Sequence, residues 1–452
     1  MGLILILLGV IAFIVIATSR FKLHPFLTLI LASFLTAFAY GLPSNEIAKT
    51  ITGGFGGILG YIGLVIVLGT IIGTILEKSG AAITMADVVI KLFGQRFPTL
   101  TMSMIGYLVS IPVFCDSGFV ILNSLKQSMA NRMKVSQVAM SVALATGLYA
   151  THTFVPPTPG PIAAAGNLGL ESQLGLVIAV GVFVAAIAAF TGMLWANRFA
   201  NEQPDGEGAE ELNAQLPDFD DLKKAYGELP SPLKAFAPIF VPIIFICLGS
   251  IANFPSKPLG EQGLFDLLVF LGQPINALMI GLFLSLFLLK GTEKIKEFSE
   301  RISQGLVVSA PILLITGAGG AFGAVLKATE IGAFLGSSLS ALGVGIFMPF
   351  IVAAALKSAQ GSSTVALVAT SALVAPLLGD IGLASEMGRV LTVMAIGAGA
   401  MTVSHANDSF FWVVTQFSRM SVKQAYRAQT MATLIQGITA MITVYLLSLI
   451  LL

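Results

Sequence analysis

HTFVPPTPGP (residues 152–161) and SHANDSFF (residues 404–411) each place a histidine and several helix-breaking or polar residues inside otherwise apolar sequence. Lipid offers no hydrogen-bond partner, so non-helical backbone at membrane depth persists only where protein or a water-filled cavity satisfies its N–H and C=O groups. Paired broken helices of this kind are typical of a transporter's binding site. The two stretches therefore indicate both a fold and the place in it where a solute would bind.

The composition is that of a membrane protein. Of the 452 residues, 56% are hydrophobic and only 10% are charged, whereas soluble domains carry roughly 25% charged residues. Apolar runs long enough to span a bilayer as a helix, roughly 17 to 25 residues, recur about ten times. We therefore predict an all-α polytopic membrane protein with about ten transmembrane helices. The first run, residues 2–18, has no positive segment before it and no cleavage site after it, which predicts a retained span.

One long hydrophilic segment, residues 196–232, separates two membrane halves, residues 1–195 and 233–452. Its proline, glycine and acidic residues are unsuited to burying a core, which predicts a cytoplasmic linker. The chain lacks the G-x-x-x-x-G-K-[ST] pattern of a phosphate-binding loop, which argues against a nucleotide-driven pump encoded on this chain. The two cysteines fit neither a disulfide framework nor a zinc spacing.

The distribution of lysine and arginine predicts the orientation, because cytoplasmic loops accumulate these residues. With both termini outside, most of the basic residues lie inside, at positions 20–22, 78–96, 126–134, 196–232, 290–301 and 419–427. This assignment requires two re-entrant hairpins, an inward-opening one at 98–126 and an outward-opening one at 343–378. Each half then runs span, interfacial helix, hairpin and broken helix, with the broken helices at 135–170 and 388–418. The halves lie in opposite orientation, which predicts two inverted repeats.

The first half offers polar candidates at its hairpin and at its break. Asp116 lies mid-hairpin, where an ionised carboxylate is costly unless it is paired or solvated. Its structural alternative is a carboxylate that stabilises the N-terminus of the second hairpin arm. His152 begins a segment whose four prolines, at 156, 157, 159 and 161, exclude regular helix. The predicted substrate-binding residues here are Ser117, Gly118, His152 and Thr153.

The second half offers a hydroxyl-rich hairpin tip. A helix beginning near Ser362 would aim its free N–H groups and its dipole at this tip, an arrangement suited to a carboxylate. The hydroxyls and amides also suit a polyol. Lys357 has two interpretations, an added positive charge at the site or an interfacial lysine whose ammonium reaches the membrane surface. The predicted substrate-binding residues here are Gln360, Gly361, Ser362, Ser363 and Thr364.

The second break combines two titratable groups. His405 and Asp408 flank Asn407 within a few residues, and an imidazole beside a carboxylate can titrate near neutrality. We predict that His405 and Asn407 contact substrate and that Asp408 or Asp116 carries a coupling proton. The alternative is a purely structural polar cluster. We predict no resident cofactor and no metal site, with a co-transported proton, or sodium as the alternative ion.

At these residues the sequence resembles the gluconate permease family, proton-coupled symporters within the ion transporter superfamily. The resemblance covers essentially the whole chain and rests on HTFVPPTPGPIAAAG, KSAQGSSTVA and SHANDSFFW, at residues 152–166, 357–366 and 404–412. The chain departs from the pattern of the gluconate carriers at CDSGF (115–119), where a Glu-Val-Gly-Phe type motif is usual, and at Thr158, where a second histidine is usual. These departures keep glycerate and D-serine open as substrates beside gluconate.

The resemblance implies a homodimer in the bacterial inner membrane, in which a substrate-carrying unit moves against a scaffold. We expect uptake of a small hydroxylated carboxylate driven by protons, and neither an enzyme nor a nucleic-acid partner. An ion channel, the first alternative, would need a continuous polar pore. An intramembrane enzyme, the second, would need a nucleophile paired with a base. Ser404, His405 and Asp408 carry suitable groups but lie in one broken helix, which disfavours the geometry of a catalytic triad.

Overall fold

The structure, a computed structural model, consists of helices joined by turns and short loops, with no strand among the residues that it describes. It describes residues 6, 9–10, 12–14, 16–17, 20–93, 96–207, 209, 227–252, 263–290, 293–329, 345–406 and 408–452. Most of the first predicted span and most of the acidic segment after residue 207 lie outside these residues. Helices without strands satisfy all their backbone hydrogen bonds within one segment, as the interior of a bilayer requires.

In both halves a long helix is followed by a helix–turn–helix pair, a broken helix and a further long helix. The first half contains α2 (Pro25–Ala39), α3 (Ser44–Lys78), α4 (Ala81–Phe93), α5 (Pro98–Val109), α6 (Cys115–Arg132), α7 (Gln137–Phe154), α8 (Pro159–Asn167) and α9 (Leu174–Ala196). The second contains α11 (Pro232–Ala252), α12 (Leu264–Gly272), α13 (Pro274–Ser285), α14 (Lys294–Lys327), α16 (Phe347–Gln360), α17 (Ser363–Val374), α18 (Glu386–Met401), α19 (Ser409–Phe417), α20 (Val422–Ala425) and α21 (Met431–Leu451). Short 3-10 turns at Glu171–Gln173, Asn197–Phe199, Leu286–Leu288 and Ala375–Leu377, and a π-helical turn at Tyr426–Thr430, complete the described elements.

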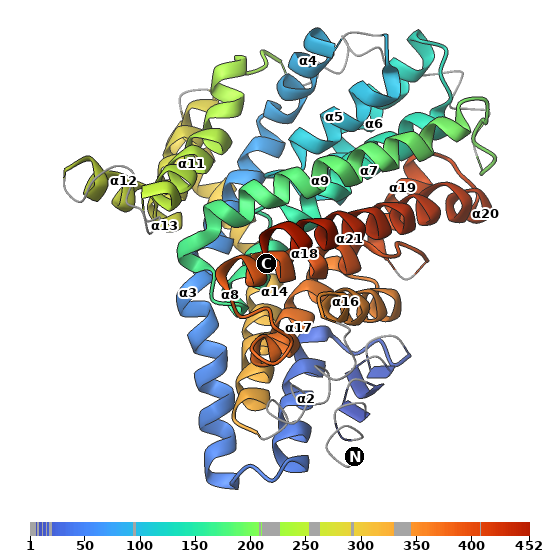
Figure 1. Cartoon of the computed structure of the whole chain (residues 1–452). Coiled ribbons are helices and arrows are strands. Elements are labelled where there is room, and N and C mark those ends of the chain that lie inside the picture. The colour runs from blue at the N-terminus through green and yellow to red at the C-terminus, as the bar shows by residue number, and fades with distance from the viewer. Residues whose placement is uncertain are drawn as a thin grey trace.

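Two long helices form one side of the molecule. The 35-residue α3 packs along the 34-residue α14 (Figure 1). They run antiparallel, because Gly54 lies against Gly320 near one end and Ile71 lies against Gly305 near the other. A β-carbon on Gly54 would lie 2.6 Å from the Gly320 carbonyl oxygen. Glycine is therefore needed for the two backbones to approach this closely, as is common between membrane helices.

The two broken helices form the centre of the fold. Every residue of α7 is buried, and so are nearly all residues of α18. Gly147 of α7 crosses α5 so closely that a β-carbon would lie 2.1 Å from the Ser103 carbonyl oxygen. α9 and α21 pack beside this centre (Figure 1). The residues that surround the breaks are thus held by helix packing on several sides.

The break in the first half is narrower than the sequence predicts. His152 still belongs to the last turn of α7, which ends at Phe154 ahead of Pro156 and Pro157. Pro159 begins α8 instead of preventing it, since proline is tolerated in the first helical turn, where its missing N–H has no intrahelical partner. The prediction that all four prolines lie in non-helical chain is therefore wrong. In the second half, α18 ends at Met401 and α19 begins at Ser409, with the second break between them.

Two helix–turn–helix pairs flank the centre: α5 with α6, and α16 with α17. α5, α16 and α17 contain 12, 14 and 12 residues, which corresponds to lengths of about 18 to 21 Å and falls short of the roughly 30 Å hydrocarbon core. Five helices among the described residues are long and apolar enough to cross a membrane, or up to seven if each of two bent pairs is one span. The count of ten spans stays a prediction.

Lys126, expected among the cytoplasmic basic residues, is fully buried in α6. Its ammonium lies 3.3 Å from the Ser418 hydroxyl and 3.5 Å from the Phe417 carbonyl oxygen, at the end of α19. A cation is stabilised at a helix C-terminus because the backbone dipoles leave partial negative charge there. Lys126 therefore joins the first helix–turn–helix pair to the helix that follows the second break.

The described start of the linker is bound to the membrane half that follows it. The Arg427 guanidinium contacts the Glu202 carboxylate at 2.8 Å, and the Ser421 N–H donates to Asp205 at 2.8 Å. The Ser136 hydroxyl also donates to the Glu202 carbonyl oxygen. These contacts fix residues 202–205 on the α20 side of the molecule.

Candidate functional site

Four segments meet at one polar cluster: the N-terminus of α6, the end of α7, the turn between α16 and α17, and the second break. The second arm of each helix–turn–helix pair touches the short helix after the opposite break, since α17 packs on α8 and α6 packs on α19. The ends of these helices supply unpaired backbone groups and partial charges. The cluster thus forms where the two halves interlock.

The centre of the cluster is a buried ion pair. The Lys357 ammonium lies 2.6 Å from Oδ2 of Asp408, and the two side chains are 0% and 6% exposed. The Ser404 hydroxyl donates to the same oxygen at 2.5 Å, while Oδ1 accepts the Phe410 N–H at 3.1 Å and so caps α19. A buried charge is tolerated only when it is paired and hydrogen-bonded, as both partners are here.

The turn after Lys357 supplies a second acceptor to its ammonium. Gly361 adopts a left-handed conformation, with φ +90°, which a glycine adopts without the steric cost of a β-carbon. Its N–H donates to the Lys357 carbonyl oxygen at 2.9 Å, and its own carbonyl oxygen accepts from the Lys357 ammonium at 2.5 Å. An ammonium has three N–H donors, and among the described residues two acceptors use two of them.

Asp116 brings a second carboxylate to the cluster. It lies in the first turn of α6, where the helix dipole favours a negative charge. It interacts electrostatically with Asp408 and Lys357, and the Ser409 hydroxyl is its side-chain hydrogen-bond partner. Its Oδ1 atom is buried without a hydrogen-bond partner among the described residues. This oxygen can accept a hydrogen bond from a solute.

His152 and Tyr149 form an aromatic wall on α7. Their rings stack with centroids 6.4 Å apart, and the Phe114 ring lies 5.9 Å from His152. His152 is 5% exposed, and among the described residues its Nδ1 atom has no hydrogen-bond partner. Tyr149 hydrogen-bonds to Ser363 across the cluster. An apolar wall with one free ring nitrogen suits the carbon chain and one polar group of a small solute.

The hydroxyl-rich tip begins α17, with Ser362 as its N-cap. The Ser362 hydroxyl accepts the Val365 N–H at 3.3 Å. Ser363 is buried, and the backbone of Thr364 faces α8, where a β-carbon on Gly160 would lie 3.6 Å from the Thr364 Cα. The helix N-terminus and these hydroxyls lie one turn from the Lys357 ammonium.

Other predicted residues lie at the edge of the cluster or away from it. His405 bonds through Nε2 to the Ser358 carbonyl oxygen at 2.9 Å, which ties the second break to α16. The Thr153 hydroxyl bonds to backbone oxygens of its own helix, and Gly118 packs α6 on Leu148. The structure describes Gln360 only as the last residue of α16, and Asn407 lies outside the described residues.

A cavity lies at each end of the α3–α14 pair. One, of about 510 Å³, is lined by Gly73, Thr74, Glu77, Lys78, Val113, Phe114, Ser117, Gln304, Val307 and Val308, and so reaches the residue beside Asp116. The other, of about 530 Å³, lies by the opposite helix ends and is lined in part by Asn167, Glu171, Lys327 and Arg389. Both volumes fall within the roughly 300 to 1,000 Å³ of small-molecule sites.

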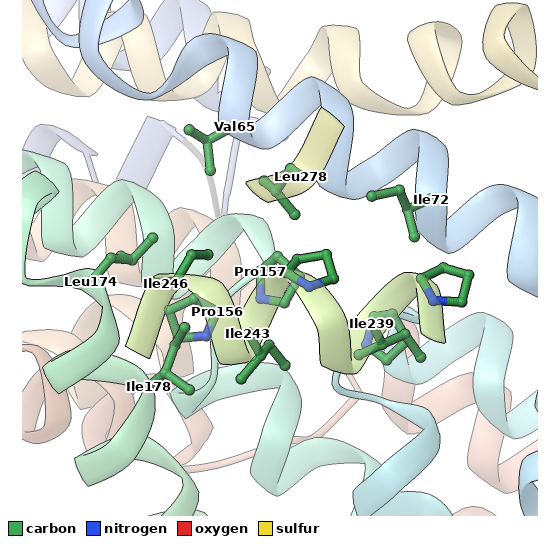
Figure 2. Close-up of a pocket in the computed structure, with 13 residues that line it drawn as sticks. Val65, Ile72, Pro156, Pro157, Leu174, Ile178, Ile239, Ile243, Ile246 and Leu278 are labelled. Carbon is green, nitrogen blue, oxygen red and sulfur yellow. The ribbon is translucent and has the colours of Figure 1, made fainter. Parts of the chain in front are cut away.

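A third, smaller cavity lies against the first break. Figure 2 shows Pro156 and Pro157 beside Ile243 and Ile246 of α11 and Leu278 of α13. Its volume is about 20 Å³, and its lining side chains are apolar. It has neither the room nor the polar groups for a hydroxylated acid. We therefore assign the candidate site to the ion-pair cluster.

Sequence reasoning missed two members of this cluster and left a third undecided. Tyr149 and Ser404 were not singled out as contact residues, and Lys357 kept two interpretations. Lys357 stands four residues before the left-handed Gly361, in an otherwise apolar segment. A lysine so placed within a membrane helix usually has a carboxylate partner. This position in the sequence could therefore have indicated that Lys357 belongs to the site.

Comparison with known proteins identifies the family. The family model for "GntP family permease" matches residues 1–450. A gluconate permease of Pseudomonas aeruginosa is 33% identical over 448 residues, covering 97% of this chain and 96% of the relative. The D-serine transporter DsdX of Escherichia coli K12 is 33% identical over 453 residues, with the same coverage of 97% and 96%.

A solved structure shares the fold. The YdaH transporter of Alcanivorax borkumensis superposes with a TM-score of 0.67 at 13% identity, covering 94% of this chain and 98% of that one. The two curated relatives carry different solutes, a sugar acid and an amino acid, and both solutes have a carboxylate and a hydroxyl group. The chain is thus a multi-pass membrane protein of the GntP family of permeases, a family of transporters and not of enzymes.

Proposed function

We propose that this chain is a secondary transporter that takes up a small hydroxylated carboxylate, gluconate or a related sugar acid, together with protons. Glycerate and D-serine are the alternative substrates within the same fold. The observation that carries the proposal is the buried Lys357–Asp408 pair beside Asp116 Oδ1, which has no hydrogen-bond partner in the part of the chain that the structure describes. A cation, two carboxylates and several hydroxyls can bind an anion and exchange a proton without covalent chemistry.

An elevator-type movement is supported by the surface on which the α5–α6 turn and the first break meet α3. Pro157 and Pro112 rest on Gly69 and Gly73, where a β-carbon would lie 3.2 Å and 2.4 Å from the proline carbonyl oxygens. Apolar side chains of α11 and α13 continue this surface (Figure 2). Because this surface has few polar groups, few hydrogen bonds would have to break when the substrate-carrying unit moves along α3. The cavities at opposite ends of the α3–α14 pair would then give access from the two membrane sides in turn, and a homodimer would hold the scaffold still.

The inverted repeats remain part of the proposal. Their support is the shared order of elements in the two halves and the antiparallel packing of α3 on α14, which are the longest helix of each half. Two halves of opposite orientation would place equivalent helices antiparallel.

Uptake into proteoliposomes tests the function directly. With the purified protein in sealed vesicles, an acidic exterior is expected to drive labelled gluconate, glycerate or D-serine above its external concentration. A channel would only equilibrate the solute, and an enzyme would change it chemically. Equilibration without accumulation, for all three solutes and with either a proton or a sodium gradient, would exclude a symporter.

The hydroxyl-rich tip should contribute to affinity. Removing the Ser362 or Thr364 hydroxyl is expected to weaken substrate binding by about 1 to 3 kcal/mol, the cost of leaving a polar partner unpaired. Ser362→Ala should also destabilise α17 by about 1 kcal/mol, since Ser362 is its N-cap. Equilibrium binding and thermal melting of each variant separate the two effects. Unchanged affinity in both variants would remove this tip from the site.

The proposed orientation has both termini outside the inner membrane. Ser172 and Glu207 are exposed residues on either side of α9. In a background without Cys115 and Cys247, a cysteine at 172 is expected to react with an impermeant thiol reagent in intact cells, and one at 207 only after permeabilisation. The opposite labelling pattern would reverse the orientation and exchange the sides of the two cavities.

A further inference from the structure

We infer that Lys357 is the cation that receives the substrate carboxylate, and that Asp408 is an internal counter-ion that the substrate displaces. The inference deepens the proposed function and rests on it. Its basis is the geometry of the ion pair: Oδ2 of Asp408 occupies, at 2.6 Å from the ammonium, the position that an acid's carboxylate oxygen would take. Both anions are acceptors of the same chemistry, so they compete for one donor group.

The burial of Lys357 makes an anionic partner obligatory. A fully buried ammonium needs an anion at all times, since leaving it unpaired exposes it to a low-dielectric interior. Asp408 serves in the empty site. Its other contacts, with the Ser404 hydroxyl and the Phe410 N–H, persist if it turns away from Lys357, because they come from its own break and helix. Asp408 is thus held in place whether or not it pairs with Lys357.

The sum of charges around Lys357 explains why a proton accompanies the acid. The titratable groups that face this centre are Asp116 and Cys115 on α6, Tyr149 and His152 on α7, and His405 and Asp408 in the second break. With both aspartates ionised, one lysine already faces two negative charges. A bound carboxylate would add a third negative charge. One proton on the displaced aspartate returns the net charge of the cluster to its value in the empty site.

The same cluster defines what a substrate must carry. Lys357 requires a carboxylate. Asp116 Oδ1, which has no partner among the residues that the structure describes, requires a hydrogen-bond donor, which a hydroxyl or an ammonium supplies. A hydroxy acid or a hydroxylated amino acid meets both conditions. The corresponding polyol, in which an alcohol replaces the carboxylate, lacks the anion and is expected to be excluded.

The test measures equilibrium binding to the purified protein in lipid nanodiscs. The probes are gluconate with its matched polyol sorbitol, glycerate with glycerol, and D-serine, each between pH 5 and 8. Wild type is expected to bind at least one acid, to prefer it to its polyol, and to bind it more tightly as pH falls. Asp408→Asn should bind that acid about tenfold more tightly at pH 8 and lose most of the pH dependence, because the competing anion is gone. Asp116→Asn should keep the pH dependence.

The double variant Lys357→Met/Asp408→Asn removes both charges together and is expected to fold but to lose the preference for acid over polyol. Lys126→Met is the matched control, a second fully buried lysine whose described partners are neutral, and it should keep the preference. The inference is wrong if wild type binds none of the acids, if Asp408→Asn binds more weakly than wild type, or if the double variant still selects the acid. Binding as expected but without gradient-driven accumulation would instead overturn the proposed coupling and leave the role of Lys357 standing.

Discussion

Lys357→Met alone is expected to destabilise the protein more than any other single substitution at the site. It leaves Asp408 and Asp116 facing each other with no cation between them, and breaking a buried ion pair by removing one partner typically costs about 3 to 5 kcal/mol. Asp408→Asn should cost less, because Asp116 remains near the lysine as a second anion. Thermal melting of the purified protein, together with the fraction that stays monodisperse in detergent, measures the difference.

The double variant Lys357→Met/Asp408→Asn completes a double-mutant cycle, which measures how strongly the two side chains interact. Removing both charges of a buried pair can be nearly neutral for stability, so the double variant should melt closer to wild type than Lys357→Met does. Lys126→Met removes a buried ammonium whose partners among the described residues are neutral, so it offers no second site for such a rescue. If Asp408→Asn fails to rescue Lys357→Met, the two side chains do not form a pair in the membrane.

Much of the fold follows from local features of the sequence. The apolar runs predict an all-helical membrane protein, and Pro156 and Pro157 interrupt the helix that ends at Phe154. The length of the break is harder to predict, because Pro159 and Pro161 are compatible both with the first turn of a new helix and with a loop. Sequence alone does not choose between these two outcomes.

The site is less visible in the sequence because its contacts are long-range. Lys357 and Asp408 are 51 residues apart, and nothing local to either residue names its partner. The same holds for Lys126, which the sequence places only among the basic residues expected in the cytoplasm. Its contact with Ser418 at the end of α19 depends on tertiary packing. Each titratable residue was noticeable singly, but the pairing depends on how α6, α16 and α19 pack.

Asp408→Asn is expected to separate exchange from accumulation. Asparagine keeps the size of the side chain and can still accept the Phe410 N–H, so the second break should hold its shape. It cannot bind and release a proton, so uphill uptake driven by a pH gradient should be abolished. Exchange of labelled for unlabelled substrate across the vesicle membrane needs no net proton movement and should continue.

His405→Ala is the comparison that makes this result specific. It removes the contact with the Ser358 carbonyl oxygen that ties the break to α16, and should lower exchange and accumulation together. Asp116→Asn tests the other carboxylate in the same two assays. If Asp408→Asn vesicles still accumulate substrate fully in response to pH while Asp116→Asn vesicles do not, the coupling proton resides on Asp116. Asp408 would then serve only as the counter-ion of Lys357 in the empty site. An asparagine at position 408 cannot bind a proton, so coupling that survives this substitution does not depend on Asp408.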